Sequence, residues 1–394
     1  MQPLPDFPAA AINPPNIPAS PESGGRIALF IPSLHGGGAE RVMVSLANGL
    51  AAQGLKVDLV LARQAGVYLA DVSPGVRIVN LNVPRTLQTL RPLARYLRQE
   101  RPATLISAMN YVNVMASWAC RIANVPTRLV LTEHANLSQL LSDSSRSMAL
   151  CLPWLMRPAY ARADAIIAVS DGVAQDLAKT LGYAAQRIHT RHNPIDTVAL
   201  AAKSTEALNH PWFAPGAPPV IMAAGRLSPE KDFPTLIRAF ALLRSQRPAR
   251  LAILGEGGER QALQAQIDQL DCKDDILLAG FQANPYTWMS RAGVFVLSSR
   301  WEGFGNVLVE AMACGTPVVS TACPSGPEEI LGQGRWGRLV PVGDAAALAQ
   351  AIDQTLSDPH PPDVRLRAQD FSVDRVVQTY LPLLLPRAPA ALTP

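Results

Sequence analysis

Two glutamates lie eight positions apart in the segment RWEGFGNVLVEAMACG, which covers residues 300–315. Glu302 precedes a loop that contains Gly303 and Gly305, and Glu310 lies about one turn inside the helix predicted to follow. We expect Asn306 to cap this helix, so that loop N–H groups lie at its positive end. Such N–H groups bind phosphate, and carboxylates accept hydrogen bonds from hydroxyl groups. The combination predicts a ligand with a diphosphate and several hydroxyls, as in a nucleotide sugar.

A second loop supplies the cations that such a ligand needs. It reads GRLSPEKD over residues 225–232, after a predicted strand and before a predicted helix. Arg226 and Lys231 are therefore expected where the diphosphate would lie. Unit charges about 4 Å apart attract by roughly 4 kcal/mol at an effective dielectric constant near 20. Loop cations are often only solvated, but beside Glu302 and Glu310 these two favour stabilisation of a departing nucleoside diphosphate.

Three consecutive glycines, residues 36–38, form a third loop between a predicted strand and a predicted helix. This position is typical of a phosphate site, and a plain tight turn is the alternative. The dinucleotide motif G-x-G-x-x-G fails here, because Arg41 stands at the third glycine. The second strand also lacks an acid at its end, since Asp58 falls inside KVDLVLA. Both departures oppose the rival enzyme class, a nicotinamide-dependent oxidoreductase.

Strands of the buried type alternate with helices, which predicts two parallel sheets of Rossmann type with a ligand cleft between them. The expected strands cover residues 26–33, 56–62, 76–83, 103–108, 128–134 and 163–170, then 220–225, 250–255, 275–280, 294–299 and 317–321. The expected helices include residues 39–54, 86–99, 284–291 and 307–314, with others between the strands.

The expected organisation has two domains and a tail. Residues 1–25 are Pro-rich and predicted to be disordered, residues 26–200 form a Rossmann-like acceptor domain, and residues 218–371 form a Rossmann-like donor domain. Residues 201–219, with four prolines, are expected to be a linker. We expect the last helix, residues 373–385, to pack back onto the first domain.

Composition narrows the possible partners and compartments. Residues 1–200 carry 18 Lys and Arg against 12 Asp and Glu, and the remainder carries 17 against 19. The basic first half favours an anionic membrane surface or a phosphorylated acceptor over nucleic acid, with ordinary solubility as the alternative. Five cysteines without a CxxC pair indicate reduced thiols in a cytoplasmic setting and no zinc site. We expect neither a signal peptide nor a membrane-spanning segment.

Four motifs in order give the chain a family resemblance. GGGAERVMVSLANGL, TEHAN, GRLSPEKDFPTLIRAF and EGFGNVLVEAMACGTPVV, the last with E-x7-E spacing, resemble the family-4 retaining glycosyltransferases of GT-B fold. The resemblance covers residues 26 to about 385 and so includes nearly everything except the tail.

The resemblance implies a role for each motif residue. Glu302 would contact hydroxyls of the donor sugar, Glu310 the ribose, and Arg226 and Lys231 the phosphates. His134 would lie against the donor sugar, although a lone histidine is more often structural. The remaining implied donor-binding residues are Gly37, Gly38, Phe304, Gly305 and Asn306 around the sugar and diphosphate, and Gly255 and Phe281 beside the nucleobase.

The resemblance also implies the reaction. We expect a hexose or N-acetylhexosamine to move, with retention of configuration and without metal or cofactor, from a nucleotide sugar to a glycan or lipid-linked saccharide. UDP is the favoured nucleotide, in lipopolysaccharide or surface-polysaccharide synthesis. The alternatives are a GDP-mannose-dependent mannosyltransferase and a non-catalytic nucleotide-sugar-binding protein.

Two stretches bear on a peripheral contact with the inner face of the cytoplasmic membrane. The helix after Pro84 carries several arginines beside leucines, which is ordinary for a helix packed on a sheet. The competing interpretation is that it touches anionic lipid together with residues 140–164. In that case Leu152, Trp154, Leu155 and Met156 would form an apolar wedge, unless they belong to the core.

Overall fold

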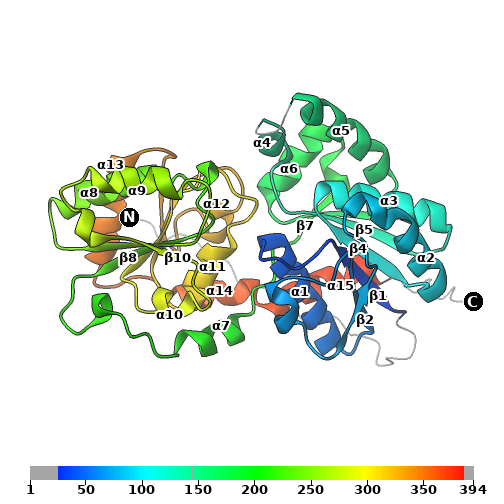
Figure 1. Cartoon of the computed structure of the whole chain (residues 1–394), viewed down its shortest axis with the longest axis horizontal. Coiled ribbons are helices and arrows are strands. Elements are labelled where there is room, and N and C mark those ends of the chain that lie inside the picture. The colour runs from blue at the N-terminus through cyan, green and yellow to red at the C-terminus, as the bar shows by residue number, and fades with distance from the viewer. Residues whose placement is uncertain (1–24, 143–145, 386–394) are drawn as a thin grey trace, which may run out of the picture.

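The computed structural model describes residues 25–142 and 146–385. They form two lobes, seen side by side in Figure 1, and each lobe is built around one parallel sheet. The two parallel sheets confirm the predicted fold class. The expected tail lies outside the described residues, apart from Gly25.

The first sheet has seven parallel strands in the order β3-β2-β1-β4-β5-β6-β7. Its strands are β1 Ile27–Ile31, β2 Val57–Leu61, β3 Val76–Asn80, β4 Thr104–Ala108, β5 Arg128–Glu133, β6 Ala165–Ala168 and β7 Ile188–Thr190. Its helices are α1 Gly38–Ala52, α2 Leu90–Glu100, α3 Asn110–Ala123, α4 Leu137–Ser142, α5 Arg146–Ala161 and α6 Asp171–Leu181. Helices α2, α3, α5 and α6 cover one face, and α1 covers the other, so the central strands are buried on both sides.

The second sheet has six parallel strands in the order β10-β9-β8-β11-β12-β13. Its strands are β8 Val220–Ala224, β9 Arg250–Leu254, β10 Ile276–Gly280, β11 Val294–Leu297, β12 Val318–Thr321 and β13 Arg338–Val340. The helices of this part of the chain are α7 Thr197–Ser204, α8 Phe233–Arg244, α9 Arg260–Asp268, α10 Tyr286–Met289, α11 Asn306–Ala313, α12 Pro327–Ile330, α13 Ala345–Leu356 and α14 Val364–Ala368.

Several elements differ from the expectation. The edge strands β7 and β13 have three residues each, too few to show a period in the sequence. Helix α7 runs into the stretch expected to be a linker. The helix expected from Thr86 begins as a 3-10 turn, and α2 starts only at Leu90. Pro92 then falls in the first turn of α2, where its missing N–H costs no hydrogen bond.

The expectation that Asn306 caps α11 is wrong. The residue before the helix is Gly305, whose φ of 100° lies in the left-handed region that favours glycine. Asn306 is already the first helical residue, one position too late to serve as the cap. Its Oδ1 instead accepts a hydrogen bond of 2.8 Å from Asn193 Nδ2, in the segment that joins the domains.

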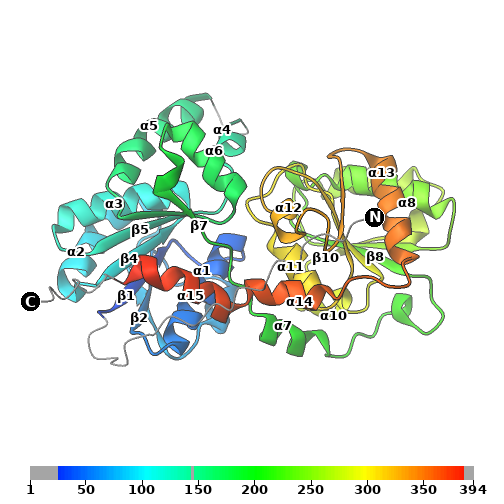
Figure 2. The same cartoon turned by 180° about the vertical axis from the view of Figure 1, so that it is seen from behind.

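The chain crosses between the domains twice, and the two crossings lie side by side. Ile195 and Ser372 form a parallel bridge, in which Ile195 N donates to Phe371 O at 2.8 Å. The last helix, α15 Val373–Leu384, then packs on α1 of the first domain, on the side of the sheet seen in Figure 2. A side chain at Gly49 of α1 would come within 2.4 Å of Val373, so glycine permits this close packing.

Asp58, in the middle of β2, is fully buried and has a structural role in the first domain. Its carboxylate accepts hydrogen bonds from Arg26 at 2.5 Å, Arg77 at 2.5 Å and the Tyr96 hydroxyl at 2.6 Å. Burial alone would raise the pKa of Asp58, but the bonds from Arg77, Tyr96 and Arg26 outweigh it and lower the pKa below its ordinary value. The Asp58 carboxylate therefore forms ion pairs inside the first domain.

Candidate functional site

The loops that follow strands of the two sheets meet at the domain interface. Asn136, after β5, donates from Nδ2 to Glu302 O at 3.0 Å. Ser170, after β6, donates to Gly303 O at 2.7 Å. The EGFG loop of the second domain, residues 302–305, is therefore bound by main-chain carbonyls to two loops of the first domain.

Glu302 and Lys231, predicted on separate loops, form an ion pair. Lys231 Nζ lies 2.6 Å from Glu302 Oε1, which also accepts a hydrogen bond of 2.6 Å from Ser299. Both charged side chains are largely buried, with 18% and 11% of their surface exposed. The Lys231 main chain is fixed as well, because Ser298 Oγ donates to its carbonyl at 2.7 Å. The result is an oriented carboxylate with a cation beside it.

Glu310 lies one turn into α11 and is buried. Its Oε1 accepts a hydrogen bond of 2.9 Å from Arg41, in the first turn of α1 in the other domain. Arg41 also donates to the Tyr286 hydroxyl, and its guanidinium lies over the Tyr286 ring, 5.5 Å from the centroid. Sequence reasoning treated Arg41 only as a departure from a dinucleotide motif. Its position just after a glycine loop was the one available signal.

The glycine loop is bound by a side chain of the helix that follows it, α1. The amides of Gly36 and Gly37 donate to Glu40 Oε2 at 2.7 and 2.9 Å, which leaves these two N–H groups already paired. A Cβ at Gly38 would lie 3.6 Å from Asn306 Nδ2, so this glycine faces the first turn of α11. The loop thus lies near the EGFG loop, but its first two amides are not available donors in this arrangement.

His134 follows β5 and is neutral. Thr132 donates its hydroxyl proton to Ser107 O at 3.0 Å, so at the 3.0 Å contact with His134 Nε2 it must accept. Nδ1 is then the acceptor of the ring, and among the described residues it has no hydrogen-bond partner although it is shielded from solvent. Burial lowers the pKa of His134 to about 4. The ring can accept a hydrogen bond at neutral pH but cannot act as an acid there.

A glycine is required where the EGFG loop approaches His134. A Cβ at Gly303 would come within 1.9 Å of His134 O, so any side chain there would force the main chain of one loop or the other to shift. Phe304, the next residue, is buried against His192 and Phe371, with ring centroids 5.3 and 5.4 Å away. Its side chain therefore belongs to the packing at the domain junction.

Three predicted residues lie apart from this cluster. Arg226 is exposed, and its guanidinium makes no hydrogen bond or ion pair within the described part of the chain. Phe281, after β10, is 72% exposed. Gly255 follows β9 with a φ of 133°, and a Cβ there would lie 1.9 Å from Gly225 O. These residues mark the ends of neighbouring strands β8 to β10, with no direct contact to Glu302.

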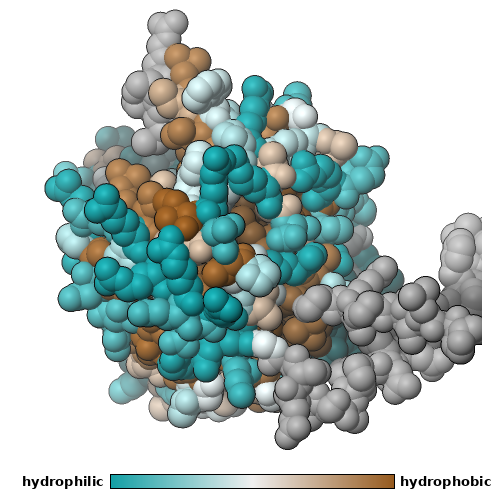
Figure 3. Space-filling view, turned by 90° about the vertical axis from the view of Figure 1, so that its right-hand side faces the viewer, coloured by the Kyte–Doolittle hydropathy of each residue, from teal (hydrophilic) through white to brown (hydrophobic). Residues whose placement is uncertain are grey.

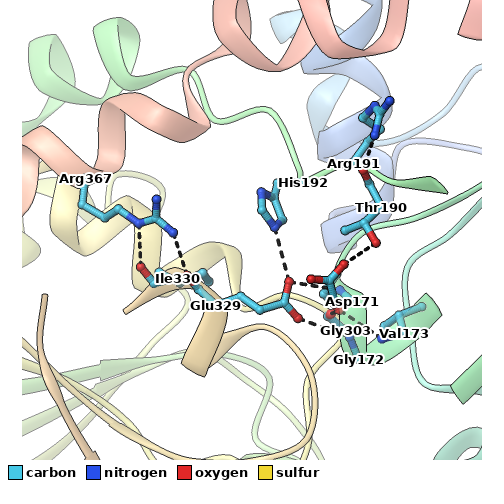
Figure 4. Close-up of polar contacts among 11 residues, drawn as sticks. Asp171, Gly172, Val173, Thr190, Arg191, His192, Gly303, Glu329, Ile330 and Arg367 are labelled. Carbon is cyan, nitrogen blue, oxygen red and sulfur yellow. Dashed lines mark hydrogen bonds and ion pairs between the residues drawn. The ribbon is translucent and has the colours of Figure 1, made fainter. Parts of the chain in front are cut away.

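A further contact between the domains is formed by Glu329 of α12 (Figure 4). Its carboxylate accepts hydrogen bonds from the amides of Asp171 at 3.0 Å and Gly172 at 3.2 Å, which begin α6, and contacts His192 Nε2 at 3.3 Å. Burial opposes ionisation of Glu329, but these partners outweigh it and lower its pKa. An ionised carboxylate at the start of a helix is favourable for the helix dipole as well. Sequence reasoning missed Glu329.

Within residues 25–142 and 146–385, no group of three or more His, Cys, Asp or Glu side chains is arranged to hold a metal ion. The five cysteines are unpaired. Burial raises the pKa of Cys120, Cys314 and Cys323 to about 12, so these thiols stay protonated.

Comparisons with known proteins agree over most of the chain. A family model described as Glycosyltransferase Family 4 matches residues 36–199, and one described as Glycosyl transferases group 1 matches residues 204–370. The chain is 29% identical over 378 residues to the Campylobacter jejuni N-acetylgalactosamine-N,N'-diacetylbacillosaminyl-diphospho-undecaprenol 4-alpha-N-acetylgalactosaminyltransferase, covering 91% of this chain and 99% of that protein. It is also 29% identical to the lipopolysaccharide core biosynthesis glycosyltransferase LpsE of Rhizobium meliloti, covering 88% of this chain and 96% of that one.

Solved structures share the fold. Anabaena HepE, solved in complex with UDP and glucose, has a TM-score of 0.75 at 23% identity, covering 91% of this chain and 99% of that chain. A glycosyltransferase from Rickettsia africae has a TM-score of 0.74 at 16% identity, covering 92% and 98%. The two matching models cover successive parts of the chain. The chain belongs to the family-4 glycosyltransferases and has the GT-B fold.

Proposed function

We propose that this enzyme transfers an N-acetylhexosamine or hexose from a UDP-sugar to a lipid-linked saccharide or lipopolysaccharide intermediate, with retention of configuration. The relatives support the substrate class, since one is named for N-acetylgalactosamine transfer to a diphospho-undecaprenol saccharide and another for lipopolysaccharide core synthesis. The structural neighbour bound to UDP and glucose supports the nucleotide.

The observation that carries the proposal is the paired Glu302 and Lys231 beside His134. We propose that a sugar near the EGFG loop meets a carboxylate that accepts from its hydroxyls, and that His134 Nδ1, which is shielded and has no partner in this arrangement, accepts another once the sugar gains access to it. Lys231 supplies positive charge for the departing diphosphate, and Arg226 is exposed and able to turn toward it.

We assign the chemistry to positioning rather than to a base. The bond from the anomeric carbon to the diphosphate oxygen breaks, and the acceptor oxygen forms its bond on the same face of the sugar. The leaving diphosphate oxygen takes the acceptor proton. Glu302 is our candidate nucleophile for a double displacement, but in this proposal its Oε1 is paired with Lys231 and Ser299 and its other oxygen accepts from a sugar hydroxyl. We therefore place catalysis in leaving-group stabilisation, without a metal ion.

The donor is tested by binding and then by transfer. UDP-N-acetylgalactosamine, UDP-N-acetylglucosamine, UDP-glucose and GDP-mannose are compared in a thermal-shift assay, in which a true donor raises the melting temperature in proportion to its affinity. Transfer to an undecaprenyl-diphosphate-linked saccharide is followed in the presence of EDTA, and NMR gives the anomeric configuration of the product. Stabilisation by GDP-mannose alone would favour the mannosyltransferase alternative. Binding without any transfer would favour a non-catalytic binding protein.

We further propose a peripheral membrane contact through the outer face of the first domain. The expected wedge is corrected by the structure: Met156 is in the core and Leu152 is half-buried, whereas Trp154 is 76% and Leu155 47% exposed. Leu150, one turn before Trp154 on α5, is 70% exposed. Within the described residues, no helix is both long and apolar enough to traverse a bilayer.

Basic residues lie on the same side of the sheet. Arg91 and Arg95 are exposed on α2, beside Leu87, which is 74% exposed. Figure 3 shows hydrophobic residues interspersed with hydrophilic ones on the outer side of this domain. Exposed apolar side chains between arginines fit the boundary of an anionic lipid surface.

Vesicle sedimentation tests this contact. We expect the protein to bind phosphatidylglycerol vesicles at low salt and phosphatidylcholine vesicles weakly. Trp154→Ser should reduce binding several-fold, whereas Leu242→Ser, at a 46% exposed leucine on α8 of the other domain, should not. Equal losses of vesicle binding in both variants, or no loss in either, would show that α5 does not contact the membrane.

A further inference from the structure

One cation of the first domain reaches the carboxylate that is proposed to bind the ribose. Arg41 Nη1 donates to Glu310 Oε1 at 2.9 Å, and the two side chains are 31% and 5% exposed. No comparison or motif assigns a role to Arg41. The contact is formed by residues 269 positions apart and exists only where α1 approaches α11.

Arg41 is fixed at a second point, which makes it a rigid partner for Glu310. Its other terminal nitrogen donates to the Tyr286 hydroxyl, and Tyr286 is buried below the guanidinium. Asn284 Oδ1 accepts from the Tyr286 amide at 3.2 Å and so anchors the start of α10. A guanidinium bound at two points orients its acceptors better than a flexible ammonium would.

The geometry leaves one oxygen of Glu310 for a ligand. Within the described residues, every hydrogen bond to this carboxylate goes to Oε1, and none goes to Oε2. A carboxylate that is paired on one oxygen is fixed in direction and charged, so its second oxygen is a strong acceptor for a hydroxyl group. Arg41 therefore determines where Oε2 points.

We propose that Arg41 is a positioning residue for the donor ribose: it orients Glu310 from the opposite domain and so links ribose recognition to the docking of α1 on α11. This inference rests on the proposed function, transfer from a UDP-sugar, and on the ribose-binding role that the family resemblance implies for Glu310. Arg41 acts through Glu310, and the phosphate cations remain Lys231 and Arg226. Ribose binding then requires both domains, although Glu310 belongs to only one of them.

The test is a thermodynamic cycle in which Arg41 is substituted in the protein and the ribose hydroxyls are removed from the ligand. Dissociation constants of UDP and 2′,3′-dideoxy-UDP are measured by calorimetry for the wild type and for Arg41→Gln. We expect Arg41→Gln to weaken UDP about tenfold, the usual scale for a hydrogen bond to a charged group. Its effect on the dideoxy ligand should be less than about twofold, since no ribose hydroxyl remains for Glu310 to bind.

A matched variant separates this role from phosphate binding. Arg226→Gln removes a cation that does not contact Glu310, so any loss of affinity should be equal for the two ligands. Arg41→Lys keeps the charge without the two-point contact, and we expect it to fold and to show most of the loss. Equal weakening of both ligands by Arg41→Gln, or no weakening, would overturn the inference. A wild type that binds no UDP would instead refute the proposed function.

Discussion

Replacing Glu133 by glutamine should change how stability depends on pH. Glu133 ends β5, directly before His134, and is buried. Its carboxylate accepts hydrogen bonds from the Tyr160 hydroxyl and from Asn113 Nδ2, the latter at 3.0 Å. Burial nevertheless raises the pKa of Glu133 to about 7, above an ordinary value of 4.5, because these two bonds are too weak to offset it.

The magnitude follows from proton linkage. Between about pH 4.5 and pH 7 the folded protein keeps a proton on Glu133 that the unfolded chain has lost. The stabilisation by this proton is fully present below pH 4.5 and is lost as pH rises to about 7. At 1.36 kcal/mol per pKa unit, the loss over this window is about 3 kcal/mol.

His134 contributes the opposite sign. Its pKa is lowered from 6.5 to about 4, so below pH 6.5 the unfolded chain binds a proton that the folded protein does not. The stability from this group is fully present above pH 6.5 and is lost as pH falls to about 4. The two neighbours therefore largely cancel between about pH 4.5 and 6.5 in the wild type. Glu133→Gln removes the contribution of Glu133, so the pH dependence that His134 causes is no longer cancelled.

Urea unfolding, followed by circular dichroism at pH values from about 4.5 to 8, measures the effect. The unfolding free energy of Glu133→Gln minus that of the wild type should increase by about 3 kcal/mol across this range. Glu328→Gln, at an exposed glutamate, is the control and should show no such trend. A difference for Glu133→Gln that stays constant within about 1 kcal/mol would refute the reasoning.

Three further predictions concern the site and the first sheet. Lys231→Ala and Glu310→Ala should each lower the rate of sugar transfer at least about tenfold without unfolding the protein, and near-normal rates in both would show that these residues do not belong to the site. Gly303→Ala would place a Cβ 1.9 Å from His134 O, so the loop must withdraw; we expect at least about a tenfold loss of transfer with unchanged circular dichroism, and a normal rate would show that this contact is dispensable. Asp58→Asn should cost about 3 kcal/mol of unfolding free energy, the low end for a broken buried ion pair because its arginine partners are partly exposed, and a cost below about 1 kcal/mol would contradict the assigned role.

The fold could be predicted because its signals are local. Buried strands appear as short apolar runs bounded by glycine, proline or a cap, and each run is readable without its neighbours. Glu302 and Lys231 could be expected near one another for the same reason, since each follows a strand of one parallel sheet. The edge strands of three residues gave no comparable signal.

Contacts between the domains could not be predicted. The partners of Arg41 and Glu329 depend on how two separate sheets are oriented, which no periodicity encodes. The pairing of the first glycine-loop amides with Glu40 was readable in principle, because a glutamate three positions into a helix commonly bonds back to its start. Asn306 was misjudged by a single residue, within the usual uncertainty of a helix boundary.

The return of α15 to the first domain reverses the order in which the two halves can mature on the ribosome. Domains generally fold as they emerge, the earlier one first. Here the second domain can be complete once residue 371 has left the exit tunnel, whereas part of one face of the first domain, beside α1, stays uncovered until residues 373–384 follow. The domain that is made first is finished last, and a gene fragment that stops at the linker would encode a first domain without the helix that completes the cover of one apolar face.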